Sequence, residues 1–213
     1  LLKHISKGIG HQTNQQIFRW MSSFTKNDID KIFLSSFKDK FLEGEDIISF
    51  LGNDKVNKKT STHDQITQIF FENYLPNDIL TKVDRASMYN SLEVRAPFLE
   101  KNIMEFSSTI KSKIKIKRNT KNILRKICKK KLPEIIVKRK KHGFAIPLSK
   151  MLRTSLKEKV SDTLTSNKTR ILEFVDKKEI KNMLNSHFKG QDNRKMIWSL
   201  YMLEKSINNN FNS

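Results

Sequence analysis

The stretch from Leu75 to Glu100, LPNDILTKVDRASMYNSLEVRAPFLE, places the strongest constraint on the fold of this chain. Pro76 suits the first turn of a helix, where its missing N–H is no loss. Asp84 borders the apolar stripe that follows, and Arg85 points away from it. The stripe has helical spacing and consists of Ile79, Leu80, Val83 and Ala86. We therefore expect a helix that begins near Pro76 and packs through this stripe.

The second half of the stretch changes its periodicity. Ser91–Arg95 alternates polar and apolar residues, which favours an extended segment. Ala96 precedes Pro97 and is biased towards extended backbone for that reason. Phe98 and Leu99 are expected to return to the core. The stretch thus predicts a helix, a short crossing and the start of another helix.

The rest of the chain also favours helices. Its 213 residues include only 6 glycines and 4 prolines, which predicts few turns and a mainly α fold in a single domain over residues 1–213. Thr25 and Asp176 are expected to cap the N-termini of helices, and Gly190 is expected to close the helix that Asp176 begins. One short strand is predicted over Ser112–Arg118, where residues alternate. Further helices are expected over Gln15–Phe24, Thr25–Phe37, Glu43–Leu51, Thr62–Tyr74, Leu99–Ile110, Asn119–Leu132, Pro147–Leu164, Asp176–Gly190 and Gln191–Ile207.

Positive charge is concentrated in one block. The formal net charge is +20, and Lys111–Lys141 holds fifteen Lys or Arg residues and one acid, Glu134. Three interpretations stay open: a solvated lysine-rich face, a pocket for a nucleotide or pyrophosphate, and a helical nucleic-acid-binding module. The block has few aromatic residues for base stacking and no recognisable nucleic-acid motif, which makes the last interpretation the weakest.

Cysteine and hydropathy bound the compartment. The single cysteine, Cys128, excludes an internal disulfide and fits a reducing compartment. No apolar run of about 18 residues is present, so no membrane partner is expected. The five histidines show no metal-ligand spacing, and no metal ligands are predicted within the chain. We expect a cytoplasmic protein.

Two motifs in order resemble a known family. Leu75–Glu100 carries L-P-x-D-I-L-x-K-x-D-R-x-S-M followed by S-L-E-x-R-x-P-F-L, and Lys138–Pro147 (KRKKHGFAIP) carries R-x-K-x-G-F-x-x-P. Together they resemble the synthetase domain of glutamine-dependent asparagine synthetases. The resemblance implies the helical C-terminal part of an α/β, adenine nucleotide α-hydrolase-like domain of the ATP-pyrophosphatase type, with its parallel sheet mostly upstream. Glu100 stands where the family usually has Asp.

The same resemblance implies the chemistry. The family adenylates the side-chain carboxylate of aspartate with ATP and Mg²⁺, and ammonia released from glutamine then attacks the β-aspartyl-AMP. The pyrophosphate loop S-G-G-x-D-S, the acidic segment that helps to hold Mg²⁺ and the catalytic cysteine of the glutaminase domain are absent from this sequence. All three lie upstream in the family. We therefore expect a fragment that is inactive alone, with the Mg²⁺ ligands mostly upstream.

Site residues follow from the motifs. Lys141 is expected to stabilise the negative charge of adenylation and amide formation, and Glu93 to orient the nucleophile or relay its proton. Residues expected to contact ATP or pyrophosphate or to line the site are Asp84, Arg85, Arg95, Lys121, Arg125, Lys140 and Gly143. Structural alternatives stay open: a solvated Lys141, an ion-paired Asp84, and a Glu93–Arg95 pair that only holds the crossing in place.

The acceptor also stays open. The residues of this chain do not separate aspartate from another carboxylate, such as that of a cell-surface polysaccharide sugar or a β-lactam precursor.

Overall fold

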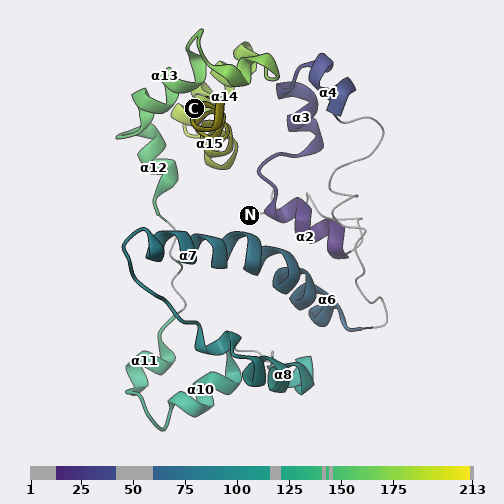
Figure 1. Ribbon diagram of the computed structural model, residues 1–213, viewed down its shortest axis with the longest axis vertical. Helices are drawn as coiled ribbons and strands as arrows, with labels where there is room; N and C mark the ends of the chain where they lie inside the picture. The colour runs from purple at the N-terminus through teal and green to yellow at the C-terminus, as the bar shows by residue number, and fades with distance from the viewer. Residues whose placement is uncertain (1–12, 42–59, 116–120, 141–142, 144–145, 212–213) are drawn as a thin grey trace. The chain divides into compact units, whose positions relative to one another are not determined.

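The computed structural model describes residues 13–41, 60–115, 121–140, 143 and 146–211 (Figure 1). The chain divides into two compact units. The first unit comprises Leu1–Asp54 and Gly143–Ser213, and the second comprises Lys55–His142. Within the described ranges the backbone is mainly helical and its β pairing is limited to one isolated bridge, so the mainly α expectation is confirmed. The single domain expected over residues 1–213 stays a prediction.

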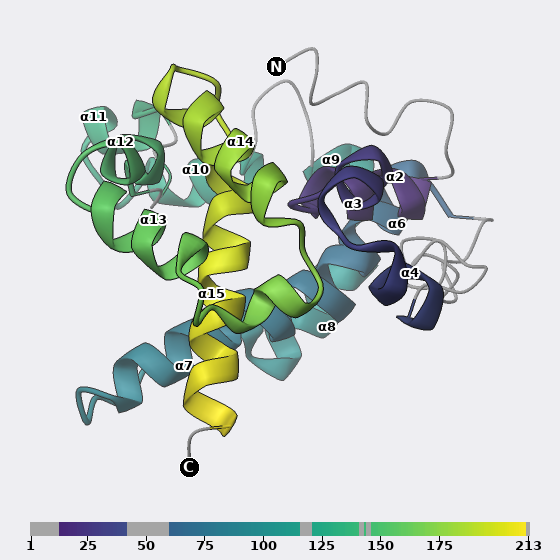
Figure 2. The same cartoon turned by 90° about the horizontal axis from the view of Figure 1, so that it is seen from above.

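The first unit consists of helices from both ends of the chain. Their bounds are α2 Thr13–Met21, α3 Lys26–Ile32, α4 Ser35–Phe41, α12 Leu148–Arg153, α13 Lys157–Thr165, the 3₁₀ helix η4 Arg170–Glu173, α14 Lys177–Phe188 and α15 Arg194–Phe211. In Figure 2, α15 runs through this unit with α13 and α14 beside it.

The two predicted N-caps and the predicted glycine at a helix C-terminus in the first unit are confirmed. Thr25 and Asp28 form a reciprocal capping box at α3, with the Thr25 N–H 2.8 Å from Asp28 Oδ2. Asp176 accepts a hydrogen bond from the Lys178 N–H at 2.6 Å and caps α14. Gly190 follows α14 with φ of +113°, a conformation that glycine adopts without a Cβ penalty.

The core of the first unit lies between α13, α14 and α15. Its buried members are Ile32, Leu152, Val160, Leu164, Ile171, Val175, Ile180, Met183, Leu184, Ile197, Leu200 and Tyr201. The Leu34 N–H donates to the Phe174 carbonyl at 2.9 Å, and the Asp176 N–H donates to the Ile32 carbonyl at 2.8 Å. These bonds flank the Phe33–Val175 bridge and fix the N-terminal helices to the start of α14.

Two predicted helices of this unit are each broken in two. The helix expected over Thr25–Phe37 stops at Ile32 because Phe33 is extended (φ −88°, ψ 140°) and pairs with Val175. The helix expected over Pro147–Leu164 is interrupted between α12 and α13, where the Leu156 N–H donates to the Met151 carbonyl at 2.8 Å. That turn lets α12 and α13 bury Leu152 and Val160 in one core. The helix expected over Glu43–Leu51 lies outside the described residues.

The second unit holds the helices in the middle of the chain. They are α6 Thr62–Ile69, the π-helical segment η2 Phe70–Leu80, α7 Thr81–Met88, the 3₁₀ helix η3 Pro97–Leu99, α8 Lys101–Thr109, α9 Ser112–Lys115, α10 Asn122–Cys128 and α11 Glu134–Lys138.

Pro76 does not begin a helix, contrary to the sequence-based expectation. The segments α6, η2 and α7 form one continuous helix, and Pro76 lies inside its π-helical part (Figure 1). A proline ring clashes with the carbonyl four residues earlier in an α-helix and lacks the N–H for that bond. Wider π turns move that carbonyl away, which accounts for a proline within the helix.

The predicted strand over Ser112–Arg118 is also wrong where it is described. Ser112–Lys115 forms the short helix α9, in which the Ile114 N–H donates to the Lys111 carbonyl at 2.8 Å. The Ser112 hydroxyl donates to the Asp64 carboxylate and holds α9 against the start of α6. Alternation over two isoleucines was the whole signal for a strand, and no strand lies beside it in the described ranges.

The stripe predicted to face the core is largely exposed. Val83, Ala86 and Phe98 are exposed, whereas Ile79, Leu80 and Leu99 are half-buried. The helical spacing is correct, but the second unit leaves much of this face exposed to solvent.

Candidate functional site

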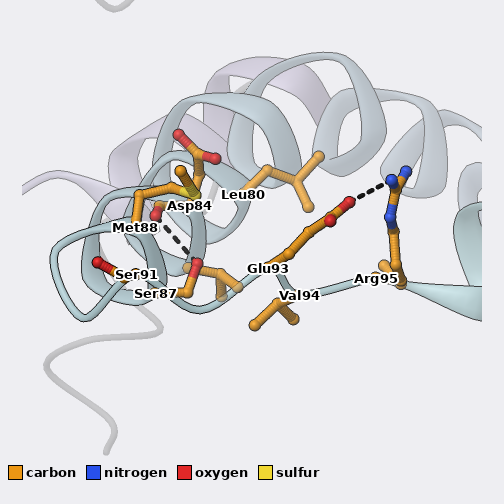
Figure 3. Close-up of a pocket in the computed structure, with 10 residues that line it drawn as sticks. Leu80, Asp84, Ser87, Met88, Ser91, Glu93, Val94 and Arg95 are labelled. Carbon is orange, nitrogen blue, oxygen red and sulfur yellow. Dashed lines mark hydrogen bonds and ion pairs between the residues drawn. The ribbon is translucent and has the colours of Figure 1, made fainter.

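An open pocket of about 720 Å³ lies between α7 and the segment that follows it (Figure 3). The chain reverses there because Ser91 adopts a left-handed conformation (φ 54°) after the end of α7. The Leu92 N–H donates to the Ser87 carbonyl at 2.9 Å, and the Ser91 N–H donates to the Met88 carbonyl at 2.9 Å. This helix-ending motif turns residues 92–96 back towards α7 and so creates the concave surface.

The polar lining comes from both sides of that reversal. The helix contributes Asp84 and Ser87, and the returning segment contributes Glu93 and Arg95. Two residues apart on an extended backbone, Glu93 and Arg95 project on the same side, and their side chains form an ion pair (Figure 3). The pair is largely exposed to solvent, so its contribution to stability is below about 1 kcal/mol.

The Asp84 carboxylate has no ion-pair partner among the residues that the structure describes. The Ser87 hydroxyl donates to the Asp84 main-chain carbonyl at 3.1 Å and leaves the carboxylate untouched. In Figure 3, Asp84 lies with Ser87, Met88 and Ser91 at one side of the drawn group, and Arg95 lies at the other.

The remaining lining is apolar and separates the charged groups. It consists of Leu80, Val83, Met88, Val94 and Ala96. A concave surface with a few polar groups among apolar side chains is the usual composition of a small-molecule site.

The other predicted site residues in the described part of the second unit do not line this pocket. Arg85 is exposed on α7. Lys121 is exposed at the start of α10 with φ of 59°, and its carbonyl accepts a hydrogen bond from the Arg125 N–H at 2.9 Å. The Arg125 guanidinium donates to the Val137 carbonyl and thereby connects α10 to α11. Arg125 therefore has a structural role in this chain.

The second motif is described only in part. Lys140 is exposed after α11, and Lys141 lies outside the described residues. Gly143 belongs to the first unit, has no left-handed φ, and a Cβ at this position would meet no atom of the described residues within 4 Å. The described residues therefore give no reason for glycine at this position.

Of the predicted site residues, the structure thus brings together Asp84, Glu93 and Arg95. Sequence reasoning missed Ser87 and Ser91 as lining residues. Helical spacing from Asp84 could have indicated Ser87, three residues later on the same face. The left-handed turn at Ser91 had no signal, since serine does not favour that conformation.

A buried histidine of the first unit was also missed. His187 is fully buried, and its Nδ1 accepts a hydrogen bond from the Asn193 N–H at 3.1 Å. The proton of the neutral ring is therefore on Nε2, which lies 3.3 Å from the Ser149 carbonyl. Burial, together with the nearby Arg153 cation, lowers the pKa of His187. Every ring nitrogen is engaged, so the histidine holds the helices together and offers no free group for chemistry.

Neither a three-residue metal cluster nor a membrane-spanning helix is found in the described residues. No group of three or more His, Cys, Asp or Glu side chains in the described ranges could hold a metal ion. Asp84 and Glu93 alone therefore do not make a complete Mg²⁺ site. No helix in the part of the chain that the structure describes is long and apolar enough to cross a membrane.

Comparison with known proteins gives a consistent result. The family model for asparagine synthase matches residues 6–208. Asparagine synthetase [glutamine-hydrolyzing] 1 of Bacillus subtilis is 34% identical over 139 residues, which are 63% of this chain and 22% of the relative. A putative asparagine synthetase of Mycobacterium bovis is 34% identical over 139 residues (63% and 21%). Asparagine synthetase 3 of B. subtilis is 33% identical over 126 residues (56% and 20%). No solved structure matches. The matched segment is about a fifth of the length of each relative.

Proposed function

This chain belongs to the asparagine synthase family, and we propose that it forms part of a glutamine-dependent asparagine synthetase. In the proposed reaction, ATP transfers its adenylyl group to the side-chain carboxylate of aspartate and pyrophosphate leaves. Ammonia from glutamine then attacks the acyl-adenylate, the bond to AMP breaks, and asparagine and AMP are released. We further propose a cytoplasmic location, which fits the single cysteine.

The observation that carries the proposal is the grouping of Asp84, Glu93 and Arg95 around one pocket. These residues come from the family motif, and the chain reversal at Ser91 brings its two halves together. Attack by ammonia leaves an extra proton on nitrogen, and a carboxylate in the pocket is a suitable acceptor for it. We assign that role to Glu93, with Arg95 holding the Glu93 carboxylate in place.

The remaining chemistry falls to groups beyond this pocket. ATP supplies the adenylyl group, and Mg²⁺ would neutralise charge on its phosphates. Lys141 is proposed to stabilise the negative charge of the transition state. Of the 18 large apolar side chains found exposed in the described residues, 15 lie in the second unit. That surface supports the proposal that further polypeptide, including a sheet and a glutaminase domain, packs over the second unit.

A chimaera tests the proposal. Residues 6–208 of this chain replace the corresponding part of B. subtilis asparagine synthetase 1, and aspartate-dependent release of pyrophosphate is measured. We expect an active chimaera whose rate falls about 100-fold or more with Glu93→Gln or Lys141→Ala. Glu105→Gln is the control, because Glu105 is exposed on α8 and does not line the pocket. Full activity of both site variants would exclude the proposed roles.

A further inference from the structure

The charges that line the pocket are not balanced. Glu93 is paired with Arg95, whereas the Asp84 carboxylate has no ion-pair partner in the described ranges. The pocket therefore presents one carboxylate that a ligand could neutralise. It lies beside the apolar side chains of Leu80, Val83 and Met88.

The local helix explains why Asp84 is unpaired. The neighbours that face it at three and four residues along the helix are Leu80, Thr81, Ser87 and Met88, and none of them is a cation. Arg85 is adjacent in sequence, and adjacent residues point in different directions on a helix. The nearby Lys82 instead forms an ion pair with Asp78, with Nζ 3.8 Å from Asp78 Oδ1.

Asp84 does not serve as a helix cap either. An acidic residue in the first turn of a helix usually stabilises free N–H groups. Here α7 continues directly from η2, and the Thr81 N–H already donates within the helix. The exposed Asp84 carboxylate thus has no structural partner in the described part of the chain.

A cationic group lies at the other side of the pocket. The ion pair with Glu93 engages one terminal nitrogen of Arg95, and a guanidinium has five N–H donors in all. Arg95 can therefore receive a second carboxylate while it holds Glu93. Figure 3 shows Asp84 and Arg95 at different sides of the group, with Leu80 and Glu93 drawn between them.

We propose that Asp84 is a specificity-determining residue that binds the ammonium group of an amino-acid acceptor, while Arg95 receives a carboxylate of the same molecule. The inference rests on the proposed function and decides between the acceptors that the sequence left open. An amino acid such as aspartate carries both charges. A sugar carboxylate has no ammonium group, so it gains nothing from Asp84 and is repelled by it.

Binding measured on the 213-residue chain tests this assignment. The isotope-labelled chain is titrated with L-aspartate and, separately, with N-acetyl-L-aspartate, which keeps both carboxylates and lacks the ammonium charge. Amide shifts of Ser87, Ser91 and Val94 report on the pocket. We expect aspartate to bind about tenfold more tightly than N-acetyl-aspartate, and Asp84→Asn to remove that difference. Asp84→Asn should leave the affinity for N-acetyl-aspartate unchanged or raise it.

Asp78→Asn is the matched control. Asp78 lies on the same long helix, is exposed and does not line the pocket, so its substitution should preserve the preference for aspartate. Glucuronate should bind no better than N-acetyl-aspartate. The inference is overturned if aspartate causes no shift at these amides, if Asp84→Asn weakens both ligands equally, or if Asp78→Asn has the same effect.

The two proposals can fail separately. A chimaera that adenylates aspartate with a KM unaffected by Asp84→Asn would support the proposed function and refute the role of Asp84. Asp84-dependent binding of aspartate, combined with a folded but inactive chimaera, would refute the proposed function alone.

Discussion

The two units of this chain differ in how many of their apolar side chains are buried. Of the 15 buried hydrophobic residues in the described part of the chain, 13 lie in the first unit and only Ile69 and Val137 lie in the second. The large exposed hydrophobic residues are distributed in the opposite way, with 3 in the first unit and 15 in the second. The first unit has its own core, whereas the second has an apolar surface that its own helices leave open.

The difference does not come from the helices themselves. Both α14 in the first unit and α7 in the second carry apolar residues at helical spacing. α14 is covered because α13 and α15 pack beside it, whereas in the described part of the second unit the main partner of α7 is η2, the segment that it continues. An amphipathic stripe therefore indicates a helix and a face to be covered, but it does not say what covers that face.

The largest loss of stability should come from truncating a core side chain of the first unit. Leu164 on α13 is fully buried, so Leu164→Ala should lower the free energy of unfolding by about 2–5 kcal/mol. Urea unfolding followed by tryptophan fluorescence measures this, since Trp20 and Trp198 both lie in the first unit.

The matched change in the second unit is Leu92→Ala. Leu92 is 58% exposed, so far-UV circular dichroism should show a loss of stability below about 0.5 kcal/mol. Equal losses for Leu164→Ala and Leu92→Ala would break the contrast between the units.

The next largest loss of stability should come from removing a buried carboxylate. Glu204 is 2% exposed and accepts hydrogen bonds from the Arg170 and Ile171 N–H groups at 3.2 and 3.0 Å. Glu204→Ala leaves both donors without this acceptor and should cost about 2–3 kcal/mol. Glu105→Ala in the second unit removes only an exposed pair with Lys101 and should cost below about 1 kcal/mol. Similar urea midpoints for the two variants would contradict this prediction.

Substitutions at two positions with positive φ should change stability less, and in opposite directions in the two units. Gly190→Ala places a Cβ at φ of +113° and should destabilise the first unit by about 1 kcal/mol. Lys121 already carries a Cβ at φ of 59° in the second unit, so Lys121→Gly should be neutral or stabilise by less than about 1 kcal/mol. Thermal melts of both variants decide the signs, and a stabilising Gly190→Ala would show that the turn does not require glycine.

The smallest effect should be the pH dependence of His187. Its pKa in the folded protein is below the ordinary value of 6.5, so the unfolded chain binds more protons at pH values below about 6.5. Stability contributed by the neutral ring is therefore fully present above pH 6.5 and is lost as the pH falls through the folded pKa. The charged groups near His187 are Arg153, which lowers its pKa, and Asp192, which opposes that shift.

Melting temperatures at pH 7.0 and 5.5 measure this. His187→Gln should flatten the decrease between the two pH values, whereas His63→Gln, at an exposed position of the second unit, should leave it unchanged. A decrease that survives His187→Gln would assign it to other groups.

The sequence predicted local structure better than packing. Capping side chains mark the N-termini of helices and glycine marks their C-termini. For that reason Thr25, Asp176 and Gly190 were assigned correctly. The break at Phe33 depends on a partner more than 140 residues away, Val175, which local patterns do not contain. In the candidate site, alternation was enough to put Glu93 and Arg95 on one side. Asp84 lines the same pocket as Glu93 and Arg95 only because the chain reverses at the left-handed Ser91, and the sequence has no signal for that turn.

The π-helical segment Phe70–Leu80 has a consequence for insertions and deletions. Each residue of an α-helix rotates the following residues by about 100°, so loss of one residue from this segment would turn α7 by roughly that angle relative to α6. The pocket is built from α7 and the segment that returns along it, and would turn as one body. The number of residues between Ile69 and Thr81 therefore sets the direction in which the pocket faces. Related chains should conserve this length more strictly than the residues that fill it.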